Sequence, residues 1–324
     1  MIWLAALSGF VVWALVGAYI SVMTRTGQLD VPNARSMHAR PKPAGAGLVI
    51  VPLVVVPGLW LAGNGPHTLL VVGVCALGLS LLGWADDMKG MPVGLRLAAQ
   101  IAAVVAALAL LPASTQALPM LPLWAERGLE ALAWVWFINL FNFMDGIDGL
   151  AGGEAAVVAA GYVLVAGVTG LGAPLAVLVV SAMLAYLAWN WAPGRVMMGD
   201  AGSLPLGYVI GWLMLDLALN GHVAAALILP AYFVTDATYT LLSRLARGRL
   251  PYEAHREHFY QRAALGCGSH GTVVAGIMIA NVCLAAMALV SMRLPLAALI
   301  GAGIVLAVLF GWLFRLQSLG VRQA

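Results

Sequence analysis

The chain has 324 residues, of which 63% are hydrophobic and only 9% are charged, and its formal net charge is +3. A mean hydropathy of +0.97 is too apolar for a soluble globular domain, so the sequence predicts an integral membrane protein. The net charge is too small to indicate nucleic acid as a partner, because the Lys and Arg residues are spread among segments that also hold acids.

Polar segments interrupt the apolar sequence at intervals of about 20 residues, the length that a helix needs to cross a bilayer. This pattern predicts helices rather than a β-barrel, and therefore an all-α fold: one polytopic membrane domain over residues 1–324 with about eleven transmembrane helices. The first span is expected to be retained rather than removed as a signal peptide. The expected spans are 3–23, 45–62, 69–85, 97–111, 129–141, 155–166, 174–189, 204–219, 223–241, 272–292 and 294–314.

The basic residues predict the orientation of the chain in the membrane. Fourteen of the 16 Lys and Arg residues lie in one set of loops and in the tail that begins at Arg315, and only Arg127 and Arg293 lie outside this set. Because cytoplasmic loops are enriched in positive charge, the N-terminus is expected outside and the C-terminus in the cytoplasm. The loops expected on the cytoplasmic face are 24–44, 86–96, 142–154, 190–203 and 242–271.

The first of these loops combines prolines and glycines with cations. The prolines and glycines fix a turn that re-enters the membrane. The cations either are ordinary flanking charges or contact a phosphate on a lipid or a nucleotide. They are Arg35, His38, Arg40 and Lys42.

The third span ends in two adjacent acids, Asp86 and Asp87. Negative charge at a helix C-terminus interacts unfavourably with the helix dipole and raises the free energy of inserting this helix end into the membrane, so another interaction must offset it. Solvation of the helix end could tolerate one of these acids, and a metal or a proton handled at this place would explain the pair. Lys89 and Arg96 follow closely enough to neutralise a carboxylate or to hold a phosphate.

The segment 136–154 places Asp145 and Asp148 three residues apart, beside Asn139 and Asn142 and among glycines. Acids at this spacing share a helix face and also converge in a turn. Because two neighbouring carboxylates repel each other, the segment predicts a bound divalent cation together with a phosphate chain.

The loop 190–203 ends in Gly199-Asp200-Ala-Gly-Ser203, with Pro205 two residues further on. Ser203 is expected to cap the next helix, so that backbone N–H groups beside Asp200 could bind phosphate. The alternative is an ordinary helix start in which Asp200 complements the dipole.

The longest cytoplasmic loop carries two histidines and two arginines: His255, Arg256, His258 and Arg262. Anion binding fits this set better than zinc, since no third ligand has zinc spacing and an arginine separates the histidines. A solvated helical face is the remaining alternative. Asp236, inside the ninth expected span, is either a functional carboxylate or one bonded to Tyr239 or to a neighbouring helix.

Four of these motifs together resemble the polyprenyl-phosphate N-acetylhexosamine-1-phosphate transferase family. The resemblance covers most of the chain in order. The His-Arg-x-His sequence that begins at His255 is similar to the one found in the bacterial branch of the family that starts lipopolysaccharide O-antigen or related surface polysaccharides. The related phospho-MurNAc-pentapeptide transferases carry a run of histidines at this position. The motifs are Asp86-Asp87, Asn142-Phe-Met-Asp145-Gly-Ile-Asp148-Gly-Leu-Ala, Met198-Gly-Asp200-Ala-Gly-Ser203 and His255-Arg-Glu-His258-Phe-Tyr-Gln-Arg262.

The resemblance implies an enzyme of the bacterial cytoplasmic membrane, with its active site facing the cytoplasm. It would transfer a sugar-1-phosphate from a UDP-sugar to undecaprenyl phosphate and release UMP, with Mg2+ or Mn2+ as cofactor. Such a reaction concentrates negative charge, so catalysis would depend on positioning and neutralisation.

The resemblance also assigns roles to individual residues. Asp200 is implied as the principal metal ligand, with Asp87 and Asp145 as further ligands. Asp86 would orient or deprotonate the lipid phosphate, and Asp148 would help to hold metal or nucleotide. The residues implied in substrate binding are Asn142, His255, Arg256, His258, Arg262, Lys89 and Arg96.

Other classes of function remain open at this point. A phospho-MurNAc-pentapeptide transferase is the nearest alternative, although Arg256 argues against its substrate. A transporter would need acids near the bilayer midplane and inverted repeats, and no such repeats are visible. If the protein were a scaffold or assembly subunit, the acidic loops would be dispensable for its function. The large apolar surface permits a homodimer.

Overall fold

The computed structural model describes residues 2–32, 36–38, 40–63, 67–250 and 255–321. Over these residues the chain forms thirteen α-helices and no strand, only one isolated bridge between Asp30 and Lys42. The all-α prediction is confirmed. The helices are α1 Ile2–Thr26, α2 Gly47–Ala62, α3 His67–Lys89, α4 Val93–Leu108, α5 Leu123–Phe143, α6 Leu150–Thr169, α7 Pro174–Asn190, α8 Asp200–Leu219, α9 Val223–Ile228, α10 Ala231–Ala246, α11 Phe259–Cys267, α12 His270–Ser291 and α13 Pro295–Val321.

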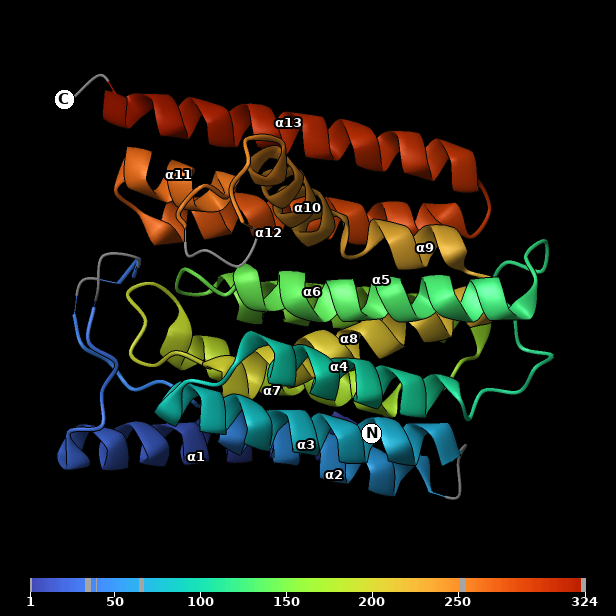
Figure 1. The fold of residues 1–324 in the computed structure, drawn as a ribbon, viewed down its shortest axis with the longest axis horizontal. Coiled ribbons are helices and arrows are strands. Elements are labelled where there is room, and N and C mark those ends of the chain that lie inside the picture. The colour runs from blue at the N-terminus through green and yellow to red at the C-terminus, as the bar shows by residue number, and fades with distance from the viewer. Residues whose placement is uncertain (1, 33–35, 39, 64–66, 251–254, 322–324) are drawn as a thin grey trace.

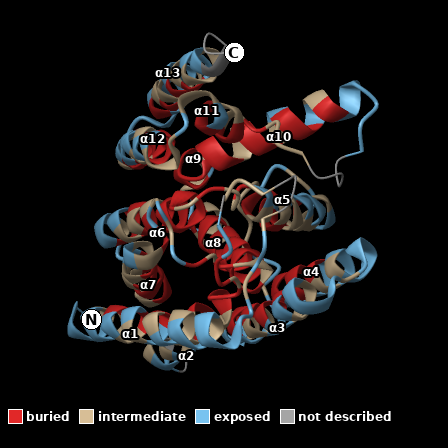
Figure 2. Ribbon diagram, turned by 90° about the vertical axis from the view of Figure 1, so that its left-hand side faces the viewer, coloured by how far each residue is buried: buried red, intermediate tan, exposed pale blue. Residues whose placement is uncertain are grey.

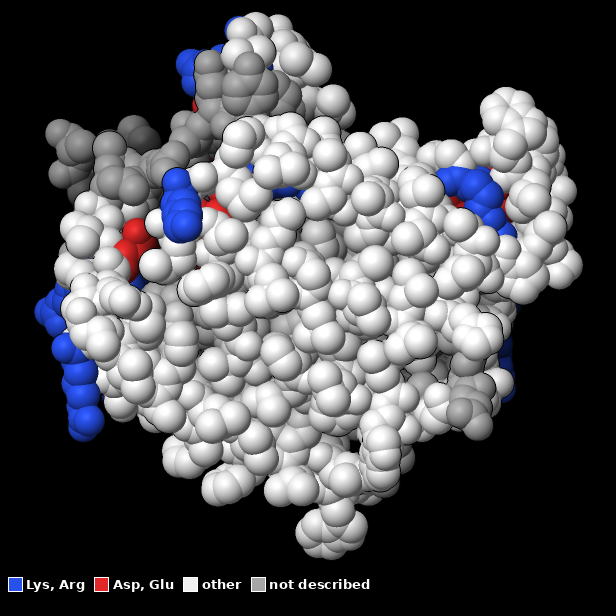
Figure 3. Space-filling model, turned by 60° about the horizontal axis from the view of Figure 1, so that its bottom comes forward, with Lys and Arg blue, Asp and Glu red and all other residues white. Residues whose placement is uncertain are grey.

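Within the described parts of the chain, six helices are long and apolar enough to cross a membrane, namely α1, α3, α6, α8, α12 and α13. Most helices run roughly along one direction, while α10 is inclined to the others (Figure 1). A broad uncharged surface lies between charged groups gathered toward opposite edges of the face seen in Figure 3. This is the charge distribution of a polytopic membrane protein. The number of eleven spans and the orientation of the termini stay predictions.

Helix α8 forms the centre of the bundle. Most of its residues are buried, including every one from Ala201 to Met214, and it packs against α2, α3, α5, α6 and α9 (Figure 2). Its aromatic contacts include Tyr208, which stacks on Trp134 of α5 at a centroid distance of 4.7 Å. The start of α8, rather than its middle, reaches the end of the bundle where the loops 27–46, 144–149 and 191–199 meet (Figure 1).

Glycines allow two helices to approach the start of α8 at backbone distance. A Cβ atom at Gly83 of α3 would lie 2.2 Å from the carbonyl oxygen of Asp200, and one at Gly47 of α2 would lie 2.1 Å from the amide nitrogen of Gly202. Both distances are far below contact distance. The position of Asp200 is therefore fixed by direct packing of α8 on α2 and α3.

We expect Gly83→Ala to lower the melting temperature, because the new methyl group has no room and such overpacking costs about 1–3 kcal/mol. The matched control is Gly78→Ala on the same helix, where a Cβ would meet nothing within 4 Å. There alanine favours the helix by about 1 kcal/mol. Thermal unfolding followed by circular dichroism measures both variants, and equal melting temperatures would contradict the close approach.

The structure corrects three sequence expectations. The single span expected over 223–241 consists of α9 and α10, which are separated at Pro230, because proline lacks the N–H that would continue the helix. The loop 242–271 contains α11, which periodicity did not predict. Ser203 is not the N-cap of α8: Gly199, with a φ of 68°, occupies that position, and Ser203 lies within the helix.

Candidate active site

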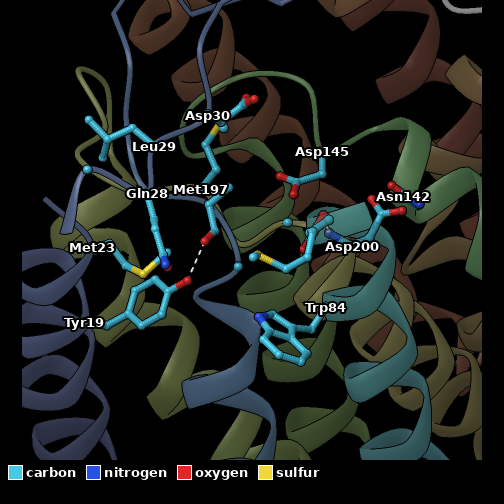
Figure 4. A pocket seen from close by; sticks show the side chains of 16 residues that line it. Tyr19, Met23, Gln28, Leu29, Asp30, Trp84, Asn142, Asp145, Met197 and Asp200 are labelled. Carbon is cyan, nitrogen blue, oxygen red and sulfur yellow. Dashed lines mark hydrogen bonds between the residues drawn. The ribbon is translucent and has the colours of Figure 1, made fainter. Parts of the chain in front are cut away.

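Two cavities meet at one set of polar side chains at the loop end of the bundle. The first, of about 490 Å³, lies between α1, the loop 27–45 and the end of α3 (Figure 4). The second, of about 460 Å³, lies between α4, α5 and α8. Asn142, Asp145 and Asp200 line both cavities. Residues far apart in the sequence thus face a shared space.

Asp87 caps α8 from another helix. Its Oδ1 accepts a hydrogen bond from the backbone N–H of Asp200 at 3.0 Å, and its Oδ2 accepts one from Ala201 at 3.1 Å. The positive end of the α8 dipole thereby offsets the cost of an acid at the C-terminus of α3. The adjacent acids that looked unfavourable in the sequence are explained in part by a structural contact.

Arg96 of α4 connects two of the predicted acids. Its Nη1 donates to Oδ2 of Asp86 and, at 3.1 Å, to Oδ2 of Asp200. Asp86 also accepts the backbone N–H of Met91 at 2.5 Å. Arg96 is therefore part of the site: it lines the second cavity together with Asp200, while Asp86, its other partner, lines neither cavity.

Asp148 lies in the turn between α5 and α6 and is neutralised by Lys42. The Nζ of Lys42 is 2.5 Å from Oδ1 of Asp148, and the backbone N–H of Gly194 donates to Oδ2 at 3.0 Å. His270, at the start of α12, has its Nδ1 3.8 Å from Oδ2. Burial alone would raise the pKa of Asp148, but the hydrogen bonds from His270 and Lys42 lower it to about 2.

Asp145, three residues earlier, has the opposite environment. No hydrogen bond or ion pair to its side chain occurs among the described residues, and it faces both cavities. Burial, followed by the negative charges of Asp148 and Asp87, raises the pKa of Asp145 to about 7. Its carboxylate is thus an acceptor that protein groups leave free.

The ion pair of Lys42 with Asp148 is the contact in the site that sequence reasoning missed. The sequence placed Lys42 only among the cations of the first loop, and its partner lies 106 positions away. The same loop pairs with the segment before α8, where Met197 N–H donates to the Pro43 carbonyl at 2.8 Å and Gly47 N–H to the Met198 carbonyl at 3.0 Å. This pairing builds a wall of the first cavity. Arg35 lies outside the described residues.

The predicted histidine and arginine set lines neither cavity. His258 is buried beneath the N-terminus of α11, and its Nδ1 lies 3.3 Å from Oδ1 of Asp236. Asp236 also accepts the hydroxyl groups of Tyr232 and Thr240 and the backbone N–H groups of Phe259 and Tyr260. It is thus bonded to a neighbouring helix, one of the two bonded arrangements expected from the sequence, and its tyrosine donor is Tyr232 rather than Tyr239. The intramembrane acid thus has a capping role at α11.

The other members of the set are placed around this capped helix. Arg256 donates to the Ser36 carbonyl in the first loop, and the Arg262 guanidinium lies 4.6 Å from the centroid of the Phe259 ring. Burial and electrostatic repulsion from His258 and Arg244 lower the pKa of His255 to about 4, so it is neutral at pH 7. Lys89 is exposed and lines neither cavity.

Tyr260 connects this segment with the acidic turn. Its hydroxyl donates to the Phe143 carbonyl at 3.1 Å, and a Cβ at Gly146 would lie 2.1 Å from the same hydroxyl. The segment 255–262 therefore supports the turn that carries Asp145 and Asp148.

The donor set fits a magnesium ion that a substrate helps to hold. No group of three His, Cys, Asp or Glu side chains among the described residues could hold a metal alone. Mg2+ usually keeps several waters and binds one or two carboxylates together with substrate phosphates. Asp145 and Asp200, which face both cavities, are suited to this arrangement, while both oxygens of Asp87 already cap α8.

Comparison with known proteins gives a consistent family. The model of glycosyl transferase family 4 matches residues 69–218. The chain is 32% identical to a phospho-N-acetylmuramoyl-pentapeptide-transferase of Trichormus variabilis, over 72% of this chain and 67% of that protein. It is 26% identical to a probable undecaprenyl-phosphate N-acetylglucosaminyl 1-phosphate transferase of Bacillus subtilis, over 74% and 71% of the two chains. A Mycobacterium pentapeptide-transferase is 32% identical, and the match spans 58% of this chain and 64% of that relative.

Proposed function

This chain belongs to glycosyl transferase family 4, a family of polyprenyl-phosphate sugar-1-phosphate transferases, and from that premise we propose that it transfers a sugar-1-phosphate from a UDP-sugar to undecaprenyl phosphate. The products are UMP and undecaprenyl-diphospho-sugar. The observation that carries the proposal is the meeting of two cavities at Asn142, Asp145 and Asp200, since a transfer between two substrates needs two binding spaces with a common centre.

We assign one substrate to each cavity by its lining. The cavity between α4, α5 and α8 has both polar and apolar lining: it contains Arg96, and Val93, Leu97, Phe143 and Leu204 form its apolar part. These groups suit a lipid phosphate that enters from the bilayer, with Arg96 beside the phosphate. The other cavity is bounded by the polar loop 27–30 and by Gly45 and Gly199, which suit the UDP-sugar.

The charges of the site support a requirement for a divalent cation. Five carboxylates lie around Arg96 and Lys42, and the two substrates would add further negative charge. Asp200 and Asp145 would hold Mg2+, with Asp87 beside them. When bound, the ion would neutralise the donor diphosphate and the charge that develops on the departing UMP.

The reaction proceeds by direct attack in this proposal. An oxygen of the lipid phosphate forms a bond to the phosphorus that carries the sugar, and the bond from that phosphorus to the oxygen of UMP breaks. The attacking phosphate is already an anion at neutral pH and needs little activation. Asp86, held by Arg96, would position that phosphate, and Asn142 would donate to an oxygen in the shared space. The proposal also keeps the sequence-based roles of Lys89 in holding a phosphate and of His255, Arg256, His258 and Arg262 in holding the donor, although none of these residues lines either cavity.

The donor is proposed to be a UDP-N-acetylhexosamine or a deoxy or amino relative, used to start a surface polysaccharide such as O-antigen on the cytoplasmic face of the bacterial inner membrane. Arg256 at the second position of the histidine motif supports this choice. The identity to pentapeptide-transferases supports the alternative donor, UDP-MurNAc-pentapeptide.

The test is UMP release by purified protein supplied with undecaprenyl phosphate, Mg2+ and a panel of UDP-sugars that includes UDP-MurNAc-pentapeptide. We expect release with an N-acetylhexosamine donor and only when the lipid is present. If UMP is released only from UDP-MurNAc-pentapeptide, that donor replaces the proposed N-acetylhexosamine donor. Release without lipid, or none with any donor, would contradict the proposed transfer.

Removal of the metal is expected to abolish this activity. An excess of EDTA should reduce UMP release to background, because the unneutralised acids of the site would repel both substrates. Added Mg2+ should restore it, and Mn2+ should substitute. Circular dichroism spectra before and after chelation serve as the control for folding. Full activity in EDTA would show that the carboxylates have another purpose.

A further inference from the structure

A third cavity, of about 320 Å³, lies between α5, α8 and α9 and takes no part in the proposed transfer. We call it the α5–α9 cavity. Its walls are almost entirely apolar, with Phe137 of α5, Met214 of α8 and Ala226 of α9 among them. Leu129 and Leu227, which also line it, are 49% and 61% exposed, so the cavity is open at its side to the hydrocarbon of the bilayer. An occupant would therefore come from the membrane.

One polar side chain interrupts this lining. Glu130 lines the cavity, its side chain is only 8% exposed, and its Oε1 is buried without a hydrogen-bond partner. The other oxygen, Oε2, accepts from Nη1 of Arg127 at 2.7 Å. A buried carboxylate oxygen without a donor is unfavourable, so the site is built to receive one.

The local charge favours a cationic donor. Glu126, one turn before Glu130, is buried and fully used by Gln116 Nε2 and the backbone N–H groups of Ala117 and Leu118. Arg127 is shared between Glu130 and two backbone carbonyls. Two carboxylates one turn apart thus have a single guanidinium near them, which bonds only Glu130 of the two, and an ammonium group would balance the excess negative charge.

The position of Glu130 also separates this cavity from the active site. Twelve positions of α5 separate Glu130 from Asn142, which corresponds to about 18 Å along the helix axis. A lipid held with its headgroup at Glu130 would belong to the leaflet opposite the acid cluster. The acceptor of the transfer must place its phosphate at that cluster, and its hydrocarbon chain has no donor for Glu130.

We propose that the α5–α9 cavity binds a membrane lipid whose headgroup carries a primary ammonium, as in phosphatidylethanolamine. The ammonium donates to Oε1 of Glu130, and one acyl chain lies along the apolar wall toward Phe137. The inference is independent of the transferase reaction, because its evidence and its test concern binding only.

The test uses the full chain, purified and stripped of lipid in detergent, then mixed with equal amounts of phosphatidylethanolamine and phosphatidylglycerol with identical acyl chains. Native mass spectrometry counts the lipid that is retained. We expect wild-type protein to prefer phosphatidylethanolamine at least about tenfold, the size expected for a hydrogen bond between charged groups. Glu130→Gln, which keeps the shape of the side chain, should remove the preference.

Two further variants keep the test decisive. Ala133→Trp fills the cavity from an exposed position and should reduce retention of both lipids. Asp216→Asn removes a carboxylate near the same end of the bundle, where it binds the Tyr162 hydroxyl outside the cavity lining, and should leave the preference unchanged. Equal retention of both lipids by the wild type, a preference that survives Glu130→Gln, or displacement of phosphatidylethanolamine by undecaprenyl phosphate would each overturn the proposal.

Discussion

Replacing Asp200 by asparagine is expected to reduce UMP release at least about a thousandfold while the protein still folds. Asp200 lines both cavities, so its carboxylate reaches the space where donor and acceptor would meet. Asparagine has the same shape and can still accept the hydrogen bond from Arg96. It lacks the negative charge that would hold Mg2+. The loss should therefore fall on turnover rather than on stability.

Asp216→Asn is the matched control for this prediction. Asp216 lies on the same helix, near its opposite end, and accepts a hydrogen bond from the Tyr162 hydroxyl at 2.5 Å. UMP release by this variant should stay close to that of the wild type. Turnover that survives Asp200→Asn, with correctly folded protein in both preparations, would remove Asp200 from the reaction.

The second large effect is expected at Lys42. Its side chain is 9% exposed and its ammonium faces Asp148, whose side chain is 12% exposed. Removing one partner of a buried ion pair leaves an uncompensated charge, which typically costs about 3–5 kcal/mol. Lys42→Met should therefore lower the melting temperature strongly. It should also lower UMP release at least about a hundredfold, because the turn with Asp145 would lose its attachment to the first loop.

A double-mutant cycle tests whether the effect passes through Asp148. Asp148→Asn added to Lys42→Met removes the unpaired charge, so most of the lost stability should return, while activity should stay low. Thermal unfolding and UMP release are measured on the same four proteins. If the two substitutions add without coupling, the ion pair does not hold the site together.

The sequence was sufficient for the coarse features of this protein. Composition predicted an all-α membrane protein, and four motifs indicated its family. The convergence of Asp87, Asp145 and Asp200 on the first cavity was also predictable, since the loops that carry them were all expected on one face. These features depend on composition, on local spacing and on the charge of loops, all of which can be read along the chain.

The remaining features depend on contacts between segments that are distant in the sequence. The acid at the end of α3 looked costly, but only packing places Asp87 against the N–H groups at the start of α8. Lys42 looked like a flanking charge because nothing in its spacing indicates Asp148. His258 has the motif position of a substrate-binding residue, yet its side chain is buried against Asp236. In each case the sequence indicates the residue but not the residue that it contacts.

A carboxylate caps the N-terminus of another helix at two places in this fold. Asp87 accepts the first N–H groups of α8, and Asp236 accepts those of α11. Each carboxylate comes from a different helix than the one it caps, so each fixes the position of a helix start relative to a neighbour. One capped helix begins at Asp200 and the other directly after His258, so these acids support the site.

The most direct test of the central idea is to locate the metal. Anomalous scattering from crystals grown with Mn2+ and a UDP-sugar should place one ion within about 2.0–2.3 Å of carboxylate oxygens of both Asp145 and Asp200, where the two cavities meet. An ion found instead between His255 and His258, or no ion although the nucleotide is bound, would contradict the account.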